Sequence, residues 1–407
     1  MTKTIGMIGA LDTKGAEFAF LKAEIEKQGC RTLVINIGVI AQPLFEPDIS
    51  AEEVARAGGT ELAELIERRD RGEAMQVMTR GVAVVAKRLQ EEGRIDGLIS
   101  MGGGGGTVVG TSAMRALPIG FPKLMVSTVA SGDVSAYVGT SDLVMMPSVV
   151  DVAGLNRISR TIFTNAAGAI CGMVMSEVGK DFEERPLIAA SQFGNTTRAV
   201  DRARSLMEAN GYEVLVFHAT GTGGKTMESL IASGYIAGVL DITTTEWADE
   251  VCGGVLSAGS NRLDAAAQAG IPQIVVPGCI DMCNFWAPET VPEKYKDRLF
   301  YQWNPNVTLM RTTPQENSRM GEIFAEKLNQ SRGPVAVFVP LKGVSELDAP
   351  GKPFWWPEAN QAFIEALKRN LRPDIPITLM DNNINDPEFS GKVAETLLEM
   401  LKKSEVQ

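Results

Sequence analysis

Histidine is almost missing from this 407-residue chain, which contains only His218. The five cysteines include no CxxC pair, and the tightest spacing is the CxxxC of Cys279 and Cys283. Structural zinc sites need Cys and His at short, regular spacings, so the sequence argues against one. We expect most of the thiols to be small buried packing residues.

The sequence also lacks a cluster of positive charge. It has 39 Lys and Arg against 50 Asp and Glu, a formal net charge of -11. Proteins that bind nucleic acid neutralise phosphates with grouped Lys and Arg, so we expect no nucleic-acid partner. No apolar run approaches the roughly 20 residues of a membrane span. The first residues lack the basic start and long apolar run of a secretory signal. We therefore expect no membrane partner and a cytoplasmic location.

Short apolar runs ended by Gly or Pro alternate with longer helical patterns along the whole chain. Continuous apolar strands separated by helices are typical of a parallel sheet covered on both faces, which predicts the α/β class. The predicted strands are TIGMIGA, TLVINIG, DGLISM, KLMVST, PLIAAS, EVLVFH, AGVLDI, QIVVPG, VAVFVP and PITLMD.

An internal repeat indicates how these strands are grouped. GCRTLVINIG aligns with GYEVLVFHAT, which matches Gly29 to Gly211, and GFPKLMVST aligns with GIPQIVVPG, which matches Pro122 to Pro272. We therefore predict two tandem Rossmann-like three-layer subdomains with mainly parallel sheets. The boundary is expected in the charged stretch 176–187, giving subdomains over 1–180 and 185–407.

Ligands of open parallel sheets bind beyond the carboxyl ends of the strands, where helix N-termini present free N-H groups. In GALDTKGAE, Asp12 or Thr13 can cap the following helix and Lys14 adds a cation, although an ordinary helix start would have the same residues.

The second loop contains five consecutive glycines followed by Thr107. Such a run costs about 0.5–1 kcal/mol per glycine relative to alanine, so we expect a ligand to approach this backbone closely. Successive N-H groups there can form an anion nest, and the pattern resembles the Gly-Gly-x-Gly-Thr nucleotide loop of NAD and lipid kinases. Tight packing of strand against helix is the alternative. The predicted phosphate contacts are Gly102, Gly103, Gly104, Gly105, Gly106 and Thr107.

The third loop, 127–146, is dense in Ser, Thr, Gly and Asp. Thr128, Ser131 and Gly132 are candidate nucleotide contacts. Asp133 and Asp142 are candidate Mg²⁺ ligands, because Mg²⁺ bound with a triphosphate takes one or two carboxylates. Ordinary turn chemistry explains the same composition equally well.

The segment FHATGTGGKTMES fits a loose phosphate-binding loop motif, but its context does not. A true P-loop follows the first strand of its fold, whereas this segment follows the second strand of its repeat. We therefore assign no nucleotide to it and interpret Lys225 as incidental. A glycine-rich turn at a helix N-terminus can still hold an anionic group of another ligand.

Further polar residues follow the strands of the second half and suggest a second ligand cleft. His218, at a strand end, and Asp281 are candidate acid/base groups, although a lone histidine is more often structural. The candidate substrate contacts of this half are Gly221, Gly223, Gly224, Thr244, Glu246 and Asn284.

Several of these motifs occur together, in order, along essentially the whole chain: GALDTKGAE, GGGGGT, FHATGTGG, LDITTTE, RTTPQEN and NINDPEF. In them the chain resembles a little-characterised bacterial family that shares the ATP-binding N-terminal region of the tomato mosaic virus resistance protein. The resemblance implies ATP with Mg²⁺ as ligand, bound in the first half, and a homodimer. The TIM-barrel domain of the plant protein is absent from this sequence, so a separate barrel protein is a possible partner. Asn383 stands where the resemblance suggests a histidine, which weakens an acid/base role for that loop.

Three functions remain open at this point. The leading one is a protein that binds ATP, with or without using it in a reaction. The second is a metabolic enzyme acting on a small carboxylate or sugar acid in the interdomain cleft. The third is a nucleotide-gated binding module that acts with a TIM-barrel partner.

Overall fold

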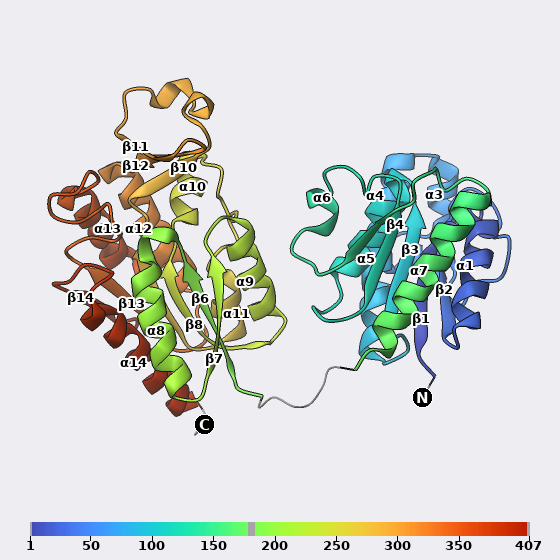
Figure 1. Ribbon diagram of the computed structural model, residues 1–407, viewed down its shortest axis with the longest axis horizontal. Helices are drawn as coiled ribbons and strands as arrows, with labels where there is room; N and C mark the ends of the chain where they lie inside the picture. Colours follow the sequence, from blue (N-terminus) through green and yellow to red (C-terminus); the bar gives the residue numbers. More distant parts are fainter. Residues whose placement is uncertain (1, 178–183, 405–407) are drawn as a thin grey trace. The chain divides into compact units, whose positions relative to one another are not determined.

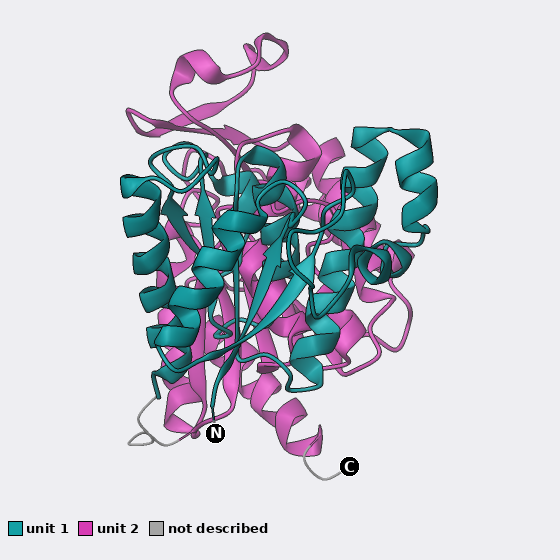
Figure 2. Ribbon diagram, turned by 90° about the vertical axis from the view of Figure 1, so that its right-hand side faces the viewer, with its two compact units in different colours: residues 1–181 teal, residues 182–407 magenta. Residues whose placement is uncertain are grey.

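Parallel strands form both large sheets of the protein, which we describe from a computed structural model covering residues 2–177 and 184–404. The chain divides into two units, residues 1–181 (unit 1) and 182–407 (unit 2). Figure 1 labels their elements and Figure 2 colours the units separately. The predicted boundary stretch includes residues 178–183, which lie outside the described residues.

Unit 1 contains a five-stranded parallel sheet in the order β2-β1-β3-β4-β5. Its strands are β1 (Thr4–Gly9), β2 (Arg31–Asn36), β3 (Gly97–Gly102), β4 (Lys123–Ser127) and β5 (Val144–Pro147). Its helices are α1 (Gly15–Lys27), α2 (Ala51–Ala57), α3 (Leu62–Arg68), α4 (Arg71–Glu91), α5 (Gly104–Arg115), α6 (Ser135–Val138) and α7 (Arg157–Met175).

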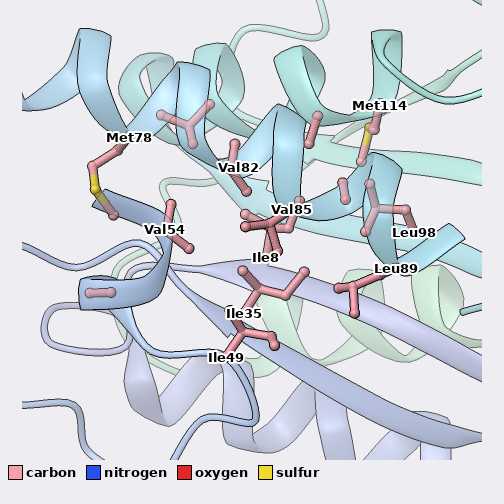
Figure 3. Packing of buried hydrophobic residues seen from close by; sticks show 14 of the residues in the cluster. Ile8, Ile35, Ile49, Val54, Met78, Val82, Val85, Leu89, Leu98 and Met114 are labelled. Carbon is pink, nitrogen blue, oxygen red and sulfur yellow. The ribbon is translucent and has the colours of Figure 1, made fainter. Parts of the chain in front are cut away.

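Helices cover both faces of this sheet. Successive side chains of a strand point to opposite faces, so Met7 and Ile8 enter different cores. Met7 belongs to a core cluster that also contains Phe18 of α1 and Phe163 of α7. Ile8 packs with α2, α4 and α5, and Figure 3 shows it among Val85, Leu98 and their neighbours. The three-layer arrangement leaves the strand ends as the accessible edges of the sheet.

Unit 2 contains a six-stranded parallel sheet in the order β14-β13-β9-β8-β6-β7 and a small antiparallel sheet in the order β10-β12-β11. The large sheet is formed by β6 (Leu187–Gln192), β7 (Glu213–His218), β8 (Ile236–Thr243), β9 (Gln273–Gly278), β13 (Val335–Pro340) and β14 (Ile377–Met380). The small sheet is formed by β10 (Met282–Phe285), β11 (Phe300–Asn304) and β12 (Val307–Arg311). The α-helices are α8 (Thr197–Ala209), α9 (Thr222–Ala232), α10 (Glu246–Cys252), α11 (Asp264–Ala269), α12 (Pro314–Leu328), α13 (Pro357–Asn370) and α14 (Pro387–Ser404), and the 3-10 turns are η1 (Gly194–Thr196), η2 (Pro288–Thr290) and η3 (Glu293–Tyr295).

The predicted repeat occupies equivalent places in the two sheets. In each unit the first strand lies between the second and third, and the fourth lies beyond the third. Gly29 precedes the second strand of unit 1 with a φ of 86°, and Gly211 precedes that of unit 2 with a φ of 88°. The Pro122 carbonyl accepts from an N-H of β3, and the Pro272 carbonyl accepts from an N-H of β8, both at 2.9 Å. The predicted α/β class and tandem subdomains are confirmed.

The structure also corrects two details and confirms another. The stretch 127–146, expected to be a loop, contains α6 and the start of β5. The small antiparallel sheet was not predicted. All five cysteines are buried, as expected for most of them, and they are unbridged.

Two glycines of unit 1 provide a test of the backbone assignment. Gly29→Ala places a side chain at a positive φ and should destabilise the protein by about 1 kcal/mol. Gly168→Ala lies inside α7, where an added Cβ meets nothing within 4 Å, and should stabilise it by about 0.5–1 kcal/mol. Urea unfolding of both variants measures the two changes, and equal signs would contradict the assignment.

Candidate functional site

A cavity of about 880 Å³ lies at a strand edge of unit 1. It lies at the carboxyl ends of β1, β2 and β3 and is closed on one side by the α3–α4 pair. Its lining comes from 10–14 after β1, 37–40 after β2, 101–106 at the β3–α5 junction, several residues of 65–78 on α3 and α4, and Asp151. In a sheet of order 2-1-3-4-5, the connections leave β1 and β3 toward opposite faces, and ligands bind at that switch point. The cavity is therefore where the topology favours a ligand.

The glycine run lies at this cavity as part of a helix start. Gly102 ends β3, Gly103 is the N-cap of α5, and Gly104, Gly105 and Gly106 form its first turn. None of the five has a positive φ. A Cβ added at Gly104 would meet nothing within 4 Å. The nearest atoms to a Cβ at Gly103, Gly105 or Gly106 would lie 3.5–3.8 Å away, an ordinary contact distance. Neither backbone conformation nor packing requires glycine at these four positions, and the space that side chains would fill belongs to the cavity.

Two helix N-termini at the cavity lack a capping side chain. The N-cap of α5 is Gly103 and that of α1 is Lys14, and neither makes a side-chain cap hydrogen bond. The first N-H groups of a helix have no intrahelical acceptor, so both ends present free donors and partial positive charge. Lys14 lines the cavity and forms no ion pair with a described residue. This combination favours an anion.

Asp12 and Thr13 also line the cavity, as predicted for ligand contacts. One carboxylate oxygen of Asp12 accepts from the N-H groups of Ile40 and Ala41, at 2.9 and 3.3 Å. The other oxygen is buried without a hydrogen-bond partner among the described residues.

The remaining predicted nucleotide residues have other surroundings. Thr107 is fully buried, and its hydroxyl donates to the Gly103 carbonyl and lies 2.6 Å from the Ser127 hydroxyl. Thr128, Ser131 and Gly132 are exposed, and the lining of the described cavity does not include them. Thr107 therefore supports the turn from within rather than facing the cavity.

The two predicted magnesium ligands are held by the protein itself. Asp142 pairs with the buried Lys123 at 2.6 Å and accepts from the N-H of Gly120. Asp133 is exposed and accepts from the N-H of Ser135. Neither lines the cavity. Among the described residues, no group of three His, Cys, Asp or Glu side chains is arranged to hold a metal ion.

In unit 2 the equivalent edge is filled by side chains. The N-H groups of Gly221 and Gly224 donate to one oxygen of Glu246, at 2.7 and 3.1 Å. The turn that was expected to hold an anionic ligand therefore holds the carboxylate of Glu246. Gly221 has a φ of 82°, and a Cβ at Gly223 or Gly224 would overlap the His218 carbonyl or Glu246. The protein's own packing explains all three glycines.

Glu246 belongs to a buried ionic cluster around Arg262, which is 1% exposed. The guanidinium binds Asp241 with two hydrogen bonds of 2.6 Å, Glu246 at 2.8 Å and Glu228 at 3.1 Å. Burial opposes the charge of Arg262, but Asp241 and Glu246 keep its pKa well above the usual value. Burial raises the pKa of Glu228 despite that guanidinium. The cluster was not predicted, because nothing in the spacing of these residues shows that they meet.

The other predicted contacts of unit 2 are buried as well. Thr244 donates to a β9 carbonyl, and Asn284 donates to Asp249. Burial raises the pKa of Asp249 to about 7. Asp281 is fully buried and accepts from Ser345, and burial together with the charge of Asp348 raises its pKa to about 7.

The two candidate acid/base groups are not neighbours. His218 is exposed at the end of the edge strand β7, with its ring edge-on to Phe193 at 5.4 Å. Asp281 follows β9, three strands away in the sheet, or about 14 Å at the usual strand spacing. The structure therefore does not bring them together as a pair.

Arg69 and Arg71 also line the unit 1 cavity and were not among the predicted site residues. They lie in a helix pair between β2 and β3, a region that the sequence marks only as a long excursion.

No described helix is long and apolar enough to cross a membrane.

Comparisons with known proteins agree with the resemblance in the motifs. The N-terminal domain of an uncharacterised protein family (UPF0261) matches residues 3–179, and the C-terminal domain of the same family matches residues 185–401. A UPF0261 protein of Clostridium tetani is 52% identical over 99% of this chain and 100% of its own. The ToMV resistance protein Tm-1 of Solanum lycopersicum is 42% identical over 82% of this chain and 45% of its own. A solved MurG from Acinetobacter baumannii is 12% identical and aligns over 98% of this chain and 100% of its own. The TM-score of 0.22 is too low to support a conclusion from this likeness. The resemblance is confirmed.

The raised pKa of Asp281 gives a test of its burial beside Asp348. Between about pH 4, near the unfolded pKa, and about pH 7, the folded protein keeps a proton that the unfolded chain has released, so this group lowers stability as pH rises. Asp281→Asn cannot ionise. Its free energy of unfolding relative to wild type should therefore increase by about 1–3 kcal/mol between about pH 5 and pH 8.

Urea unfolding at the two pH values measures this difference. Asp297→Asn, a change at an exposed carboxylate of the same unit, is the control and should show little dependence on pH. A constant difference between Asp281→Asn and wild type would contradict the assignment.

Proposed function

The chain belongs to the uncharacterised protein family UPF0261, and from the unit 1 cavity we propose that it binds ATP at the β1/β3 edge. The observation that carries the proposal is the turn Gly103–Gly106. Four glycines there are required neither by φ nor by packing, and they border a cavity at an uncapped helix N-terminus. A phosphate group accounts for both features, because it accepts from free N-H groups and needs close approach to the backbone.

The rest of the cavity suits the nucleoside. Its apolar wall includes Val39, Ile66, Met75 and Met78. A planar base can bury its faces against such side chains, and methionine adapts readily to the shape of a ring. The volume of about 880 Å³ is within the range usual for sites of small molecules.

Magnesium would enter this site with the phosphates of the nucleotide. Asp133 and Asp142 do not fit as its ligands, since both are engaged elsewhere and lie outside the cavity lining. Asp12 fits better, because it lines the cavity and keeps one carboxylate oxygen without a partner among the described residues. Mg²⁺ bound with phosphates takes one or two carboxylates, and its own role there is to neutralise phosphate charge.

The other expectations stay predictions. They are the cytoplasmic location, the homodimer, the separate TIM-barrel partner and a small carboxylate or sugar acid as a second ligand. In the described part of unit 2, Gly221 and Gly224 bind Glu246, and Thr244 and Asn284 bind other buried groups of the protein.

Calorimetry with MgATP tests the proposal. Gly104→Val should fold normally, because its Cβ meets no atom within 4 Å. Its side chain would occupy the phosphate position and weaken ATP binding by at least about tenfold, since charge-assisted hydrogen bonds to the turn would be lost.

Lys225→Ala is the matched control at the other glycine-rich turn. It should leave the ATP affinity nearly unchanged. Undiminished affinity in Gly104→Val would overturn the assignment, and a loss confined to Lys225→Ala would move the nucleotide to unit 2.

A further inference from the structure

The α3–α4 pair forms the cavity wall opposite the glycine turn, and this wall has an apolar part and a charged end. Arg71, Met75 and Met78 are spaced at i, i+4 and i+7 on α4, so they share one face of the helix, and all three line the cavity. The Met75 side chain lies 3.6 Å from the position of a Cβ at Gly105. This face of α4 therefore looks directly onto the start of α5. Its apolar part lies deeper along the helix, and its charged end is Arg71.

A second arginine, Arg69, lies two residues before Arg71 in the chain. Arg69 ends α3 with a φ of 52°, in the left-handed region that favours glycine, and it too lines the cavity. Neither Arg69 nor Arg71 forms an ion pair or a side-chain hydrogen bond with any residue that the structure describes. Other arginines of these helices are paired: Arg68 binds Glu64 and Glu73, and Arg88 binds Glu53.

The cavity thus has two separate groups of cationic or donor groups. The first is the glycine turn with Lys14 and the uncapped ends of α1 and α5, which suffices for one phosphate. The second is the pair Arg69 and Arg71 on the facing wall. A guanidinium carries five N-H donors and binds phosphate oxygens in pairs, so arginine is well suited to a doubly or triply charged tail.

Resting on the proposed nucleotide site, we propose that Arg69 and Arg71 hold the outer phosphates of a nucleoside di- or triphosphate. The site then selects such nucleotides against monophosphates. The two arginines are specificity-determining residues, because a monophosphate bound at the glycine turn leaves them without a partner.

The test is calorimetry of the full chain with AMP, ADP and ATP at one ionic strength. Wild type should bind ADP and ATP at least about tenfold more tightly than AMP. Arg71→Gln should weaken the affinity for ATP about tenfold and change the affinity for AMP less than about twofold. Arg69→Gly should weaken the affinity for ATP by a similar factor. Its melting temperature should be no lower than that of wild type, because glycine adopts the positive φ without strain. That combination separates a binding role from a structural one.

Arg68→Gln is the matched control, one residue from Arg69 but outside the cavity lining, and should bind all three nucleotides like wild type. The inference is overturned if wild type binds AMP as tightly as ATP, or if both cavity variants behave like Arg68→Gln; the nucleotide site itself survives either result. Wild type that binds none of the three nucleotides overturns the site and this inference together.

Discussion

A parallel strand can return to its own sheet only through a crossover, and this constraint arranges both units. Helices that follow a strand begin at the carboxyl edge of the sheet, and each start leaves N-H groups without an acceptor. Something must satisfy those donors. In unit 2 the carboxylate of Glu246 does so at the start of α9. In unit 1 the starts of α1 and α5 have no capping side chain and border a cavity. The starts of α10 and α13 in unit 2 also lack a capping side chain, so the cavity at the starts of α1 and α5 is the physical basis for placing a ligand in unit 1.

The two units therefore share a topology but differ at their glycine-rich turns: Glu246 fills the turn of α9, and the turn of α5 borders a cavity. The glycines of the α9 turn are needed by the protein, because Gly221 has a positive φ and side chains at Gly223 or Gly224 would overlap neighbouring atoms. Those at the start of α5 have no such need. The α9 turn fits the P-loop spacing better, because it contains Lys225 and Thr226, but composition does not show which turn the protein's own side chains already occupy. The surrounding tertiary contacts decide that, and they include Arg262 and its three carboxylates.

Much of the fold could be predicted because its signals are local. Apolar runs identified the strands of the large parallel sheets except β5, and the repeat of Gly29 with Gly211 fixed their equivalence. β5 was missed because it is only four residues long and none of them is buried, and the small antiparallel sheet because its short strands contain polar residues such as Asn284 and Gln302. In the site, Lys14 and the glycine run were predicted from their place after strands. Arg69 and Arg71 were not predicted. They lie in the long segment between β2 and β3, and only the long-range packing of that segment brings them to the cavity. The ion pair of Asp142 with Lys123 could not be predicted for the same reason, because residue spacing does not show that the two side chains meet.

The central claim is that the free amides at the start of α5 hold phosphate. A crystal structure of the full chain with a non-hydrolysable ATP analogue tests it most directly. We expect phosphate density within hydrogen-bond distance of the N-H groups of Gly104, Gly105 or Gly106, with the base against Met75 and Met78. Density for the analogue at any other place, with the α5 start occupied by water alone, would contradict it.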